Sequence, residues 1–382
     1  MNILFLCGSI EPGCDGVGDY TRRLAEELVL LNHKVSVIAL DDKYVSNVKH
    51  QADFNHGGIS TYRIPTSFTD QQRCNQARDW IDQINPDMVS LQFVIYSFHK
   101  KGLPFGLKNT ICKICEGRSL HIMFHETWLG VTKSASLKHK IYGFFQKQII
   151  SSLVKSLKPR LITTTNVLYK TLLNQLSVTA QIIPLFSNIP IADKDEVFIS
   201  NIYSQLKLDS IKTYYIAGIF GNIYPDSNIR EAIIDLEESA RAKNKKLLVL
   251  GFGKISGKAS SIFQQLEFEF SDRMIIKHLG EFDTERLSNI IQILDVAISP
   301  TPAKHIGKSG VYAALRLHDK KVIIPNTQLF PEYEVEIIDF NNQLEIKSPE
   351  SFNVSNVAKD FSRLICQSLP SLTSHQQLST PL

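Results

Sequence analysis

The sequence lacks a cysteine framework and any apolar run long enough to cross a membrane. Its six cysteines follow no regular spacing, and the pair Cys112 and Cys115 has no second Cys or His pair to complete a zinc site. A membrane-spanning helix needs about 20 apolar residues. The first residues are strand-like rather than like a signal peptide. These absences exclude a disulfide scaffold, and we expect a cytoplasmic protein with at most peripheral membrane contact.

A large excess of one charge is also missing. The 382 residues contain 42 Lys and Arg against 38 Asp and Glu, a net charge of +4. Proteins that track nucleic-acid phosphates carry a concentrated basic surplus, so we expect no nucleic-acid partner. The 43% hydrophobic content is that of a globular protein. Because single cores stop growing near about 250–300 residues, two domains are expected.

Strand-like and helix-like segments alternate in both halves of the chain, which is typical of doubly wound parallel sheets. The first half has predicted strands at 2–7, 34–40, 88–92, 121–125 and 161–165, with helices at 19–31, 70–84 and 138–157. The second half has predicted strands at 214–220, 246–251, 274–278, 296–300 and 321–324, with helices at 229–242, 284–294 and 311–318. The sequence therefore predicts an α/β protein with two Rossmann-like domains.

Between the two halves, the pattern weakens into residues rich in Pro, Asn and Ser, which marks a boundary. We predict a first domain over 1–183, a linker over 184–212 and a second domain over 213–368, whose final helix packs back on the first. The last residues, 369–382, have no periodicity and are predicted to be a flexible tail.

Gly16 and Gly18 lie between the first strand and the first helix, where backbone N–H groups and the helix dipole can receive a phosphate. An NAD site is the alternative, with Asp41 at the end of the second strand as the ribose ligand. That fingerprint needs a third glycine where this chain has Thr21, and the loop is longer than usual. A purely structural role for both glycines stays open.

His125 and Glu126 directly follow a predicted buried strand, so their side chains should emerge at the carboxyl edge of the sheet, where α/β proteins bind ligands. A histidine there can hydrogen-bond a sugar hydroxyl, and a neighbouring acid can set its tautomer. We therefore predict both as catalytic residues. A structural histidine at a strand end is the alternative, because buried polar groups need partners in any case.

A second glycine loop, His305-Ile306-Gly307-Lys308-Ser309-Gly310, leads into a predicted helix. Lys308 at the positive end of that helix is locally unfavourable unless an anion lies beside it, so we predict that Lys308, Ser309 and Gly310 bind a diphosphate. The segment Gly-Lys-Ser also ends an ATP-binding Walker loop. The glycine that this loop requires five positions before Gly307 is missing, which argues against an ATPase, and Ala303 does not supply it either.

Two further segments belong to the predicted site or its surroundings. Gly221 and Asn222 follow the first strand of the second half and are predicted to face the same cleft. Residues 133–160 carry seven Lys and Arg around aromatic side chains, a composition that can dock on anionic lipid. A solvated helix face is the alternative for this segment.

Taken together, the loop at 16–21, the segment 125–130, the boundary at 184–188 and the second alternating half resemble glycosyltransferase family 4 and its GT-B relatives. The resemblance implies a GT-B fold with a cleft between the two domains. It implies retaining transfer from a nucleoside-diphosphate sugar, without metal or other cofactor, to a glycan, lipid-linked or other small acceptor. The first domain would face the acceptor, with Asp19, Tyr20 and Trp128 on that side, and the second would hold the donor nucleotide.

The chain departs from the family's pattern at four positions. Asn222 and Ser227 stand where the family usually has Arg and Lys. The family's pair of glutamates would fall at Ile306 and Ala314, which cannot hydrogen-bond a ligand through their side chains. Our hypothesis is that the loop around Lys308 replaces the missing cations, as in a divergent bacterial subset. A GT-B protein that binds nucleotide or glycan without turnover, or scaffolds a biosynthetic complex, and a nucleotide-sugar epimerase remain alternatives.

Overall fold

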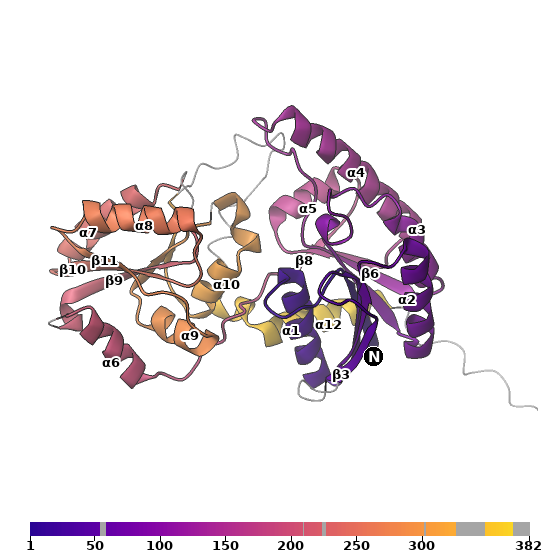
Figure 1. The fold of residues 1–382 in the computed structure, drawn as a ribbon, viewed down its shortest axis with the longest axis horizontal. Coiled ribbons are helices and arrows are strands. Elements are labelled where there is room, and N and C mark those ends of the chain that lie inside the picture. Colours follow the sequence, from indigo (N-terminus) through magenta and orange to yellow (C-terminus); the bar gives the residue numbers. More distant parts are fainter. Residues whose placement is uncertain (54–58, 209, 224–226, 302, 326–347, 370–382) are drawn as a thin grey trace, which may run out of the picture.

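The computed structural model describes the chain except for residues 54–58, 209, 224–226, 302, 326–347 and 370–382. Two lobes, each built on its own sheet, lie side by side, with helix α10 facing the first lobe (Figure 1). The eight-stranded sheet of the first lobe has the order β3-β4-β2-β1-β5-β6-β7-β8, and the five-stranded sheet of the second has the order β11-β10-β9-β12-β13. All pairings are parallel except that of β3 with β4.

The first sheet is covered on both faces, as its nearly continuous apolar strands require. Its strands are β1 (Asn2–Cys7), β2 (Lys34–Asp42), β3 (Lys49–Asp53), β4 (Ile59–Pro65), β5 (Met88–Phe93), β6 (Ser119–Phe124), β7 (Leu161–Thr164) and β8 (Gln181–Ile182). One face packs on α2 (Asp70–Ile84), α3 (Leu107–Ile114), α4 (Leu137–Leu157) and α5 (Val167–Asn174). The other face packs on α1 (Gly16–Leu30) and α12 (Val354–Ser368).

The second sheet has the same layering on a smaller scale. Its strands are β9 (Tyr214–Phe220), β10 (Lys246–Phe252), β11 (Ile275–His278), β12 (Val296–Ile298) and β13 (Val322–Ile323). One face packs on α7 (Ile229–Arg241) and α8 (Gly257–Glu269), and the other on α6 (Glu196–Gln205), α9 (Thr284–Gln292) and α10 (Gly310–Leu317). Short 3-10 turns cover Ile95–Ser97, Ile211–Thr213, Ala303–Lys308 and Pro349–Phe352.

Helix α12 belongs to the second half of the sequence but packs in the core of the first lobe. The Phe361 ring stacks on Phe5 of β1 at 5.8 Å between centroids. The Ser362 hydroxyl lies 2.7 Å from His33 Nε2, beside the start of β2. The chain therefore crosses between the lobes twice.

Several predicted bounds differ from those observed. Helix α1 begins at Gly16 rather than at 19, because Asp15 caps it through its carboxylate. The hairpin of β3 and β4 was not predicted. The predicted linker at 184–212 contains helix α6, and the cores change over within it: Phe186 lies in the first core and Ile189 in the second.

Candidate functional site

The site lies where the carboxyl ends of the central strands meet, at the points where strand order reverses. In the first sheet, β1 lies between β2 and β5, and in the second, β9 lies between β10 and β12. The loop after β1 approaches the turn after β5 so closely that a Cβ atom on Gly8 would lie 2.6 Å from Ser97. Only glycine fits there.

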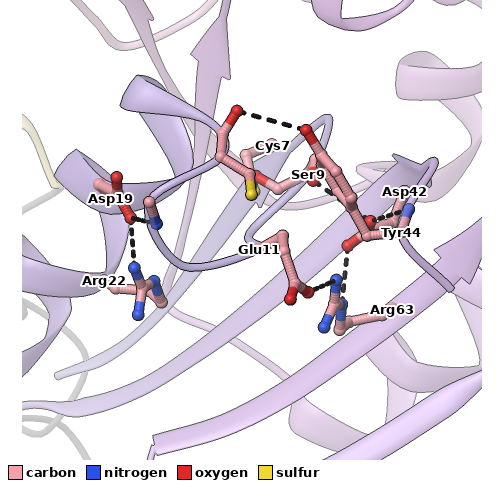
Figure 2. Close-up of polar contacts among 10 residues, drawn as sticks. Cys7, Ser9, Glu11, Asp19, Arg22, Asp42, Tyr44 and Arg63 are labelled. Carbon is pink, nitrogen blue, oxygen red and sulfur yellow. Dashed lines mark hydrogen bonds and ion pairs between the residues drawn. The ribbon is translucent and has the colours of Figure 1, made fainter. Parts of the chain in front are cut away.

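The loop after β1 is held by a buried network of charges. Asp42 is fully buried and accepts hydrogen bonds from Arg63 Nε at 2.7 Å and from the Ser9 hydroxyl at 3.2 Å. Arg63 also donates to Glu11 in the loop, at 2.6 Å. Figure 2 shows these side chains converging beneath the loop. Because the network joins β2, β4 and the loop, the path of the loop is fixed before any ligand arrives.

The predicted anion site at the start of α1 is filled by the chain itself. The Asp15 carboxylate accepts hydrogen bonds from the N–H groups of Val17 and Gly18, at 3.0 and 2.8 Å. A Cβ atom at Gly18 would lie 2.6 Å from the Ser9 carbonyl, whereas at Gly16 it would meet nothing within 4 Å. Close packing therefore explains Gly18, and the phosphate-binding role of both glycines stays a prediction.

Asp19 and Asp41 are also engaged within the protein. Asp19 accepts a hydrogen bond from the Gly13 N–H at 3.0 Å and pairs with Arg22. Asp41, the residue on which an NAD site would depend, pairs with Arg73 at 2.5 Å. Neither carboxylate is left without a partner, so the geometry gives no support to a ribose contact at Asp41.

A pocket of about 230 Å³ in the first lobe faces the second lobe, from which Lys308 is the one described lining residue, so it brings together predicted residues from both halves. It is lined by the segment from Glu126 to Thr132, by residues of α4 and α5, and by Lys308. Lys308 Nζ lies 3.7 Å from Glu126 Oε1, and the two side chains are 38% and 40% exposed. A pair so long and so exposed adds little stability, which leaves Lys308 able to bind an anion.

The lobes are in close contact beside Lys308. A Cβ atom on Gly307 would lie 2.5 Å from Cβ of Asn166, the residue that caps α5 through its side chain. Any larger residue would push the lobes apart, so this glycine sets how near the second lobe can come to the pocket.

His125 lies beneath the site, buried and outside the described pocket lining. Its Nε2 is 2.9 Å from Gln92 Oε1, and its ring edge meets Tyr20 at 4.9 Å between centroids. Burial lowers the pKa of His125 to about 3. The imidazole is therefore neutral at physiological pH and cannot serve as a general acid there.

A chain of buried hydrogen bonds fixes the tautomer of His125. Gln92 Nε2 donates to Ser90 Oγ at 2.8 Å, Ser90 lies 2.8 Å from His121 Nδ1, and His121 Nε2 lies 2.8 Å from Thr163 Oγ1. Thr163 in turn donates to the sulfur of Met123 at 2.8 Å. Because the Gln92 amide N–H donates to Ser90, the Gln92 atom that faces His125 is the carbonyl oxygen, which can only accept. We therefore assign the His125 proton to Nε2, which leaves Nδ1 as a hydrogen-bond acceptor.

The two aromatic residues predicted on the acceptor side are both buried. Tyr20 stacks on Phe186 at 4.6 Å between centroids, and within the described part of the chain its hydroxyl has no hydrogen-bond partner. Burial raises the pKa of that hydroxyl. Trp128 lines the pocket, with Lys147 Nζ 5.1 Å from its ring. Trp128 thus lies at the site, whereas Tyr20 lies under it.

The predicted residues of the second lobe, apart from Lys308, have local structural partners. Gly221 has a φ of +83°, which favours glycine, and Asn222 accepts a hydrogen bond from the Ser256 N–H at 2.6 Å. Ser309 caps α10 by accepting from the Tyr312 N–H at 3.2 Å. Gly310 opens the helix, where a Cβ atom would meet nothing within 4 Å. None of these four is among the described residues that line the pocket.

Ile306 and Ala314, where the glutamate pair was expected, are buried among apolar side chains, 1% and 0% exposed. Carboxylates at these positions would be costly to bury. That other residues hold a donor stays a prediction. Among the described residues, no group of three or more His, Cys, Asp or Glu is placed to hold a metal ion, and no described helix is long and apolar enough to cross a membrane.

The sequence pattern missed the residues that support the site. Gln92, Ser90 and His121 are polar residues inside strands whose neighbours are all apolar, and that mismatch was a usable signal. The Arg63–Glu11 pair joins residues 52 positions apart, through a strand that was not predicted. No local pattern could have joined them.

Two covered sheets with their carboxyl edges meeting at a pocket lined from both lobes define the GT-B fold. The comparisons agree: the chain is similar to Anabaena HepE in complex with UDP and glucose, with a TM-score of 0.54 and 13% identity over 96% of this chain and 100% of that one. It is also similar to the catalytic domain of Arabidopsis thaliana starch synthase IV bound to ADP and acarbose, with a TM-score of 0.51 and 11% identity over 97% and 99%.

An epimerase shares this architecture as well. The Methanocaldococcus jannaschii UDP-GlcNAc 2-epimerase matches with a TM-score of 0.50 and 10% identity over 96% of this chain and 100% of that one. No family model and no curated protein matches the sequence. Identities this low show the fold, and the activity has to be argued from the site.

Proposed function

We propose that the protein transfers a glycosyl group from a nucleoside-diphosphate sugar to a glycan, lipid-linked or other small acceptor, with retention and without metal. The observation that carries the proposal is Lys308, which the second lobe brings to a pocket lined by Glu126 and Trp128 of the first. Complexes of similar folds with UDP and with ADP add support. Kinship with family 4 and a cytoplasmic location are part of the same proposal.

In this reaction, the bond between the anomeric carbon and the diphosphate oxygen breaks, and an acceptor oxygen takes its place. The acceptor proton leaves with the nucleoside diphosphate. Negative charge grows on the leaving diphosphate, where the Lys308 ammonium and the first N–H groups of α10 would stabilise it. Neutral His125, with its free Nδ1 acceptor, would receive a hydrogen bond from a sugar hydroxyl.

Titration calorimetry with UDP, ADP and GDP tests the donor site. The variant Lys308→Ala should lose about tenfold to hundredfold in affinity, because a charge-assisted hydrogen bond contributes about 1.5–3 kcal/mol. The matched control is Lys258→Ala, an exposed lysine on α8, which should bind as the wild type does. Equal affinity in the Lys308 variant would overturn the assignment.

Binding without turnover is the second candidate, favoured by the burial of Ile306 and Ala314. A panel of nucleotide sugars, ranked by thermal shift and then assayed for transfer and for epimerisation, separates the candidates. Transfer that persists in EDTA supports the proposal. A donor that stabilises the protein but is neither transferred nor epimerised favours the binding protein.

We also propose that residues 133–160 contact a membrane, which would bring a lipid-linked acceptor to the protein.

A further inference from the structure

The positive charge of the chain is concentrated in one stretch of the first lobe. Residues 88–192 contain 13 Lys and Arg but 2 Asp and Glu, whereas the rest of the chain contains 29 and 36. Residues 127–192 contain no acidic residue. The small net charge of the whole chain therefore hides a strongly basic region, which contains α3, α4 and α5.

An apolar face lies in the middle of this basic region. Helix α4 exposes four large apolar side chains at helical spacing: Leu137 is 74% exposed, Ile141 49%, Phe144 58% and Phe145 42%. Phe105, 62% exposed and in the loop before α3, meets the Phe145 ring edge-on at 6.4 Å. We call these five residues the docking face.

The docking face differs from the scattered apolar residues that any surface carries. Eleven large apolar side chains are exposed in the described part of the chain, and five of them are these neighbours. The opposite side of α4 is buried in the core through Ile149, Ile150 and Leu153. The helix thus has one side packed in the protein and another that is apolar but uncovered. Figure 1 shows α4 at the outer rim of the first lobe, beside α3.

Lysines flank the docking face at both of its parts. Lys138 and Lys140 alternate with its residues on α4, and Lys100 and Lys101 precede Phe105; all four are exposed. Apolar side chains that insert at the lipid interface, surrounded by ammonium groups that meet anionic headgroups, are the pattern of a membrane-binding surface. A protein partner of ordinary composition would not require lysines beside both parts of the docking face.

We infer that the docking face binds the surface of an anionic lipid bilayer. Phe105, Phe144 and Phe145 enter the headgroup region, and the four lysines pair with lipid phosphates. The inference rests on the proposed function for its biological role, because a membrane surface would present a lipid-linked acceptor to the protein. Lipid binding itself requires no glycosyl transfer.

The same helix connects the docking face to the pocket that faces the second lobe. His139 of α4 lines that pocket. Gln146, buried on α4, accepts a hydrogen bond from the Leu129 N–H at 2.9 Å and donates to the Gly102 carbonyl at 3.2 Å. A bilayer on the outer side of α4 therefore lies one helix away from Glu126 and Lys308, within reach of an acceptor whose anchor stays in the lipid.

Vesicle sedimentation tests the inference on the full chain. The wild type should bind to vesicles of equal parts phosphatidylcholine and phosphatidylglycerol, and should bind much less to vesicles of phosphatidylcholine alone. The double variant Lys138→Glu/Lys140→Glu should lose about tenfold or more in partitioning, because each lysine contributes about 1 kcal/mol at an anionic surface. The double variant Phe144→Ser/Phe145→Ser should lose about as much, because binding also scales with the apolar area that enters the interface.

Two matched controls come from the second lobe. Phe268→Ser removes a phenylalanine that is 84% exposed on α8, and Lys258→Glu reverses an exposed charge there; both should bind vesicles as the wild type does. The inference is overturned if the wild type ignores anionic vesicles, or if the controls lose as much binding as the docking-face variants.

The alternative occupant is a second copy of the chain. Light scattering would then find a dimer that Phe144→Ser/Phe145→Ser dissociates, and this result would also overturn the inference. Transfer to a soluble acceptor should be unchanged in every docking-face variant. Vesicle binding without transfer in any variant would contradict the proposed function and leave the docking face standing.

Discussion

The two glycine-bearing loops that the sequence predicts as phosphate-binding differ in how firmly the protein holds them. The loop after β1 is fixed by the buried Asp42–Arg63–Glu11 network and by Asp15 at the start of α1. The loop around Lys308 is held by the Ser309 cap, by a 3.0 Å hydrogen bond between the Ser309 and Thr301 hydroxyls and by the burial of Ile306. The Lys308 side chain itself has one long, exposed ion pair with Glu126. The first loop is therefore held rigidly, whereas the Lys308 side chain on the second can adjust to a ligand.

The largest expected effect comes from removing the buried ion pair that holds the loop after β1. Asp42→Ala leaves Arg63 buried without its strongest partner and should lower the free energy of unfolding by about 3–5 kcal/mol. The counterpart in the loop around Lys308, Ser309→Ala, removes the cap of α10 and should cost about 0.5–2 kcal/mol. Urea unfolding measures both. Equal losses would contradict the difference between the loops.

Acid should weaken the first lobe through its buried histidines. Burial lowers the pKa of both His121 and His125 to about 3, whereas histidine in an unfolded chain titrates near about 6.5. Between these values the unfolded state binds more protons, so stability is lost as the pH falls below 6.5 and is unaffected above it. From pH 7 to pH 5 the free energy of unfolding should fall by roughly 2–4 kcal/mol.

Urea unfolding across this pH range gives the slope, and two variants locate its source. Burial also lowers the pKa of His33 in the first lobe and of His278 and His318 in the second, so the wild type reports all five histidines. His121→Gln should reduce the slope of the first lobe's contribution, and His318→Gln that of the second's. A flat wild-type profile between pH 7 and pH 5 would refute the prediction.

Within the first loop, two neighbouring glycines separate packing from ligand binding. Gly18→Ala places a methyl group 2.6 Å from the Ser9 carbonyl and should cost about 1–3 kcal/mol. Gly16→Ala meets open space and should be neutral or stabilise by up to about 1 kcal/mol. If Gly16→Ala leaves stability intact but weakens nucleotide binding in calorimetry, the role predicted for Gly16 is supported; unchanged binding removes it.

The smallest expected effect on stability comes from the contact between the lobes. Gly307→Ala should change the free energy of unfolding by less than about 1 kcal/mol, because it touches no core. Transfer should nevertheless fall by about tenfold to hundredfold, since a displacement of about 1 Å misplaces Lys308. Gly257→Ala at the start of α8, where the added methyl meets nothing within 4 Å, is the control. Full activity in Gly307→Ala would show that close approach is unnecessary.

Much of the fold could be predicted from the sequence because its strands are continuous apolar runs bounded by glycine and asparagine. The predicted bounds of β1 and α2 agree with those observed, and both sheets were expected. The hairpin of β3 and β4 escaped because its strands mix charged and apolar residues with partial burial. Helix α6 escaped because its sequence falls where proline and asparagine are frequent.

The site was predicted less completely than the fold. Glu126, Trp128 and Lys308 do meet at one pocket, because strand ends and helix starts share the carboxyl edge of a sheet. His125 and Tyr20 were expected at the surface of the cleft, yet both are buried. A residue's place along a strand gives its edge of the sheet, but its depth depends on neighbours from distant segments.

Helix α12 constrains the order in which the molecule can be made. A ribosome releases β1 more than three hundred residues before it releases Phe361, and Phe361 fills the core beside β1. One apolar face of the first-lobe sheet must therefore wait, covered only by α1, while the whole second lobe is synthesised. A truncation before α12 should expose that face and lead to aggregation, even though it removes no residue of the pocket.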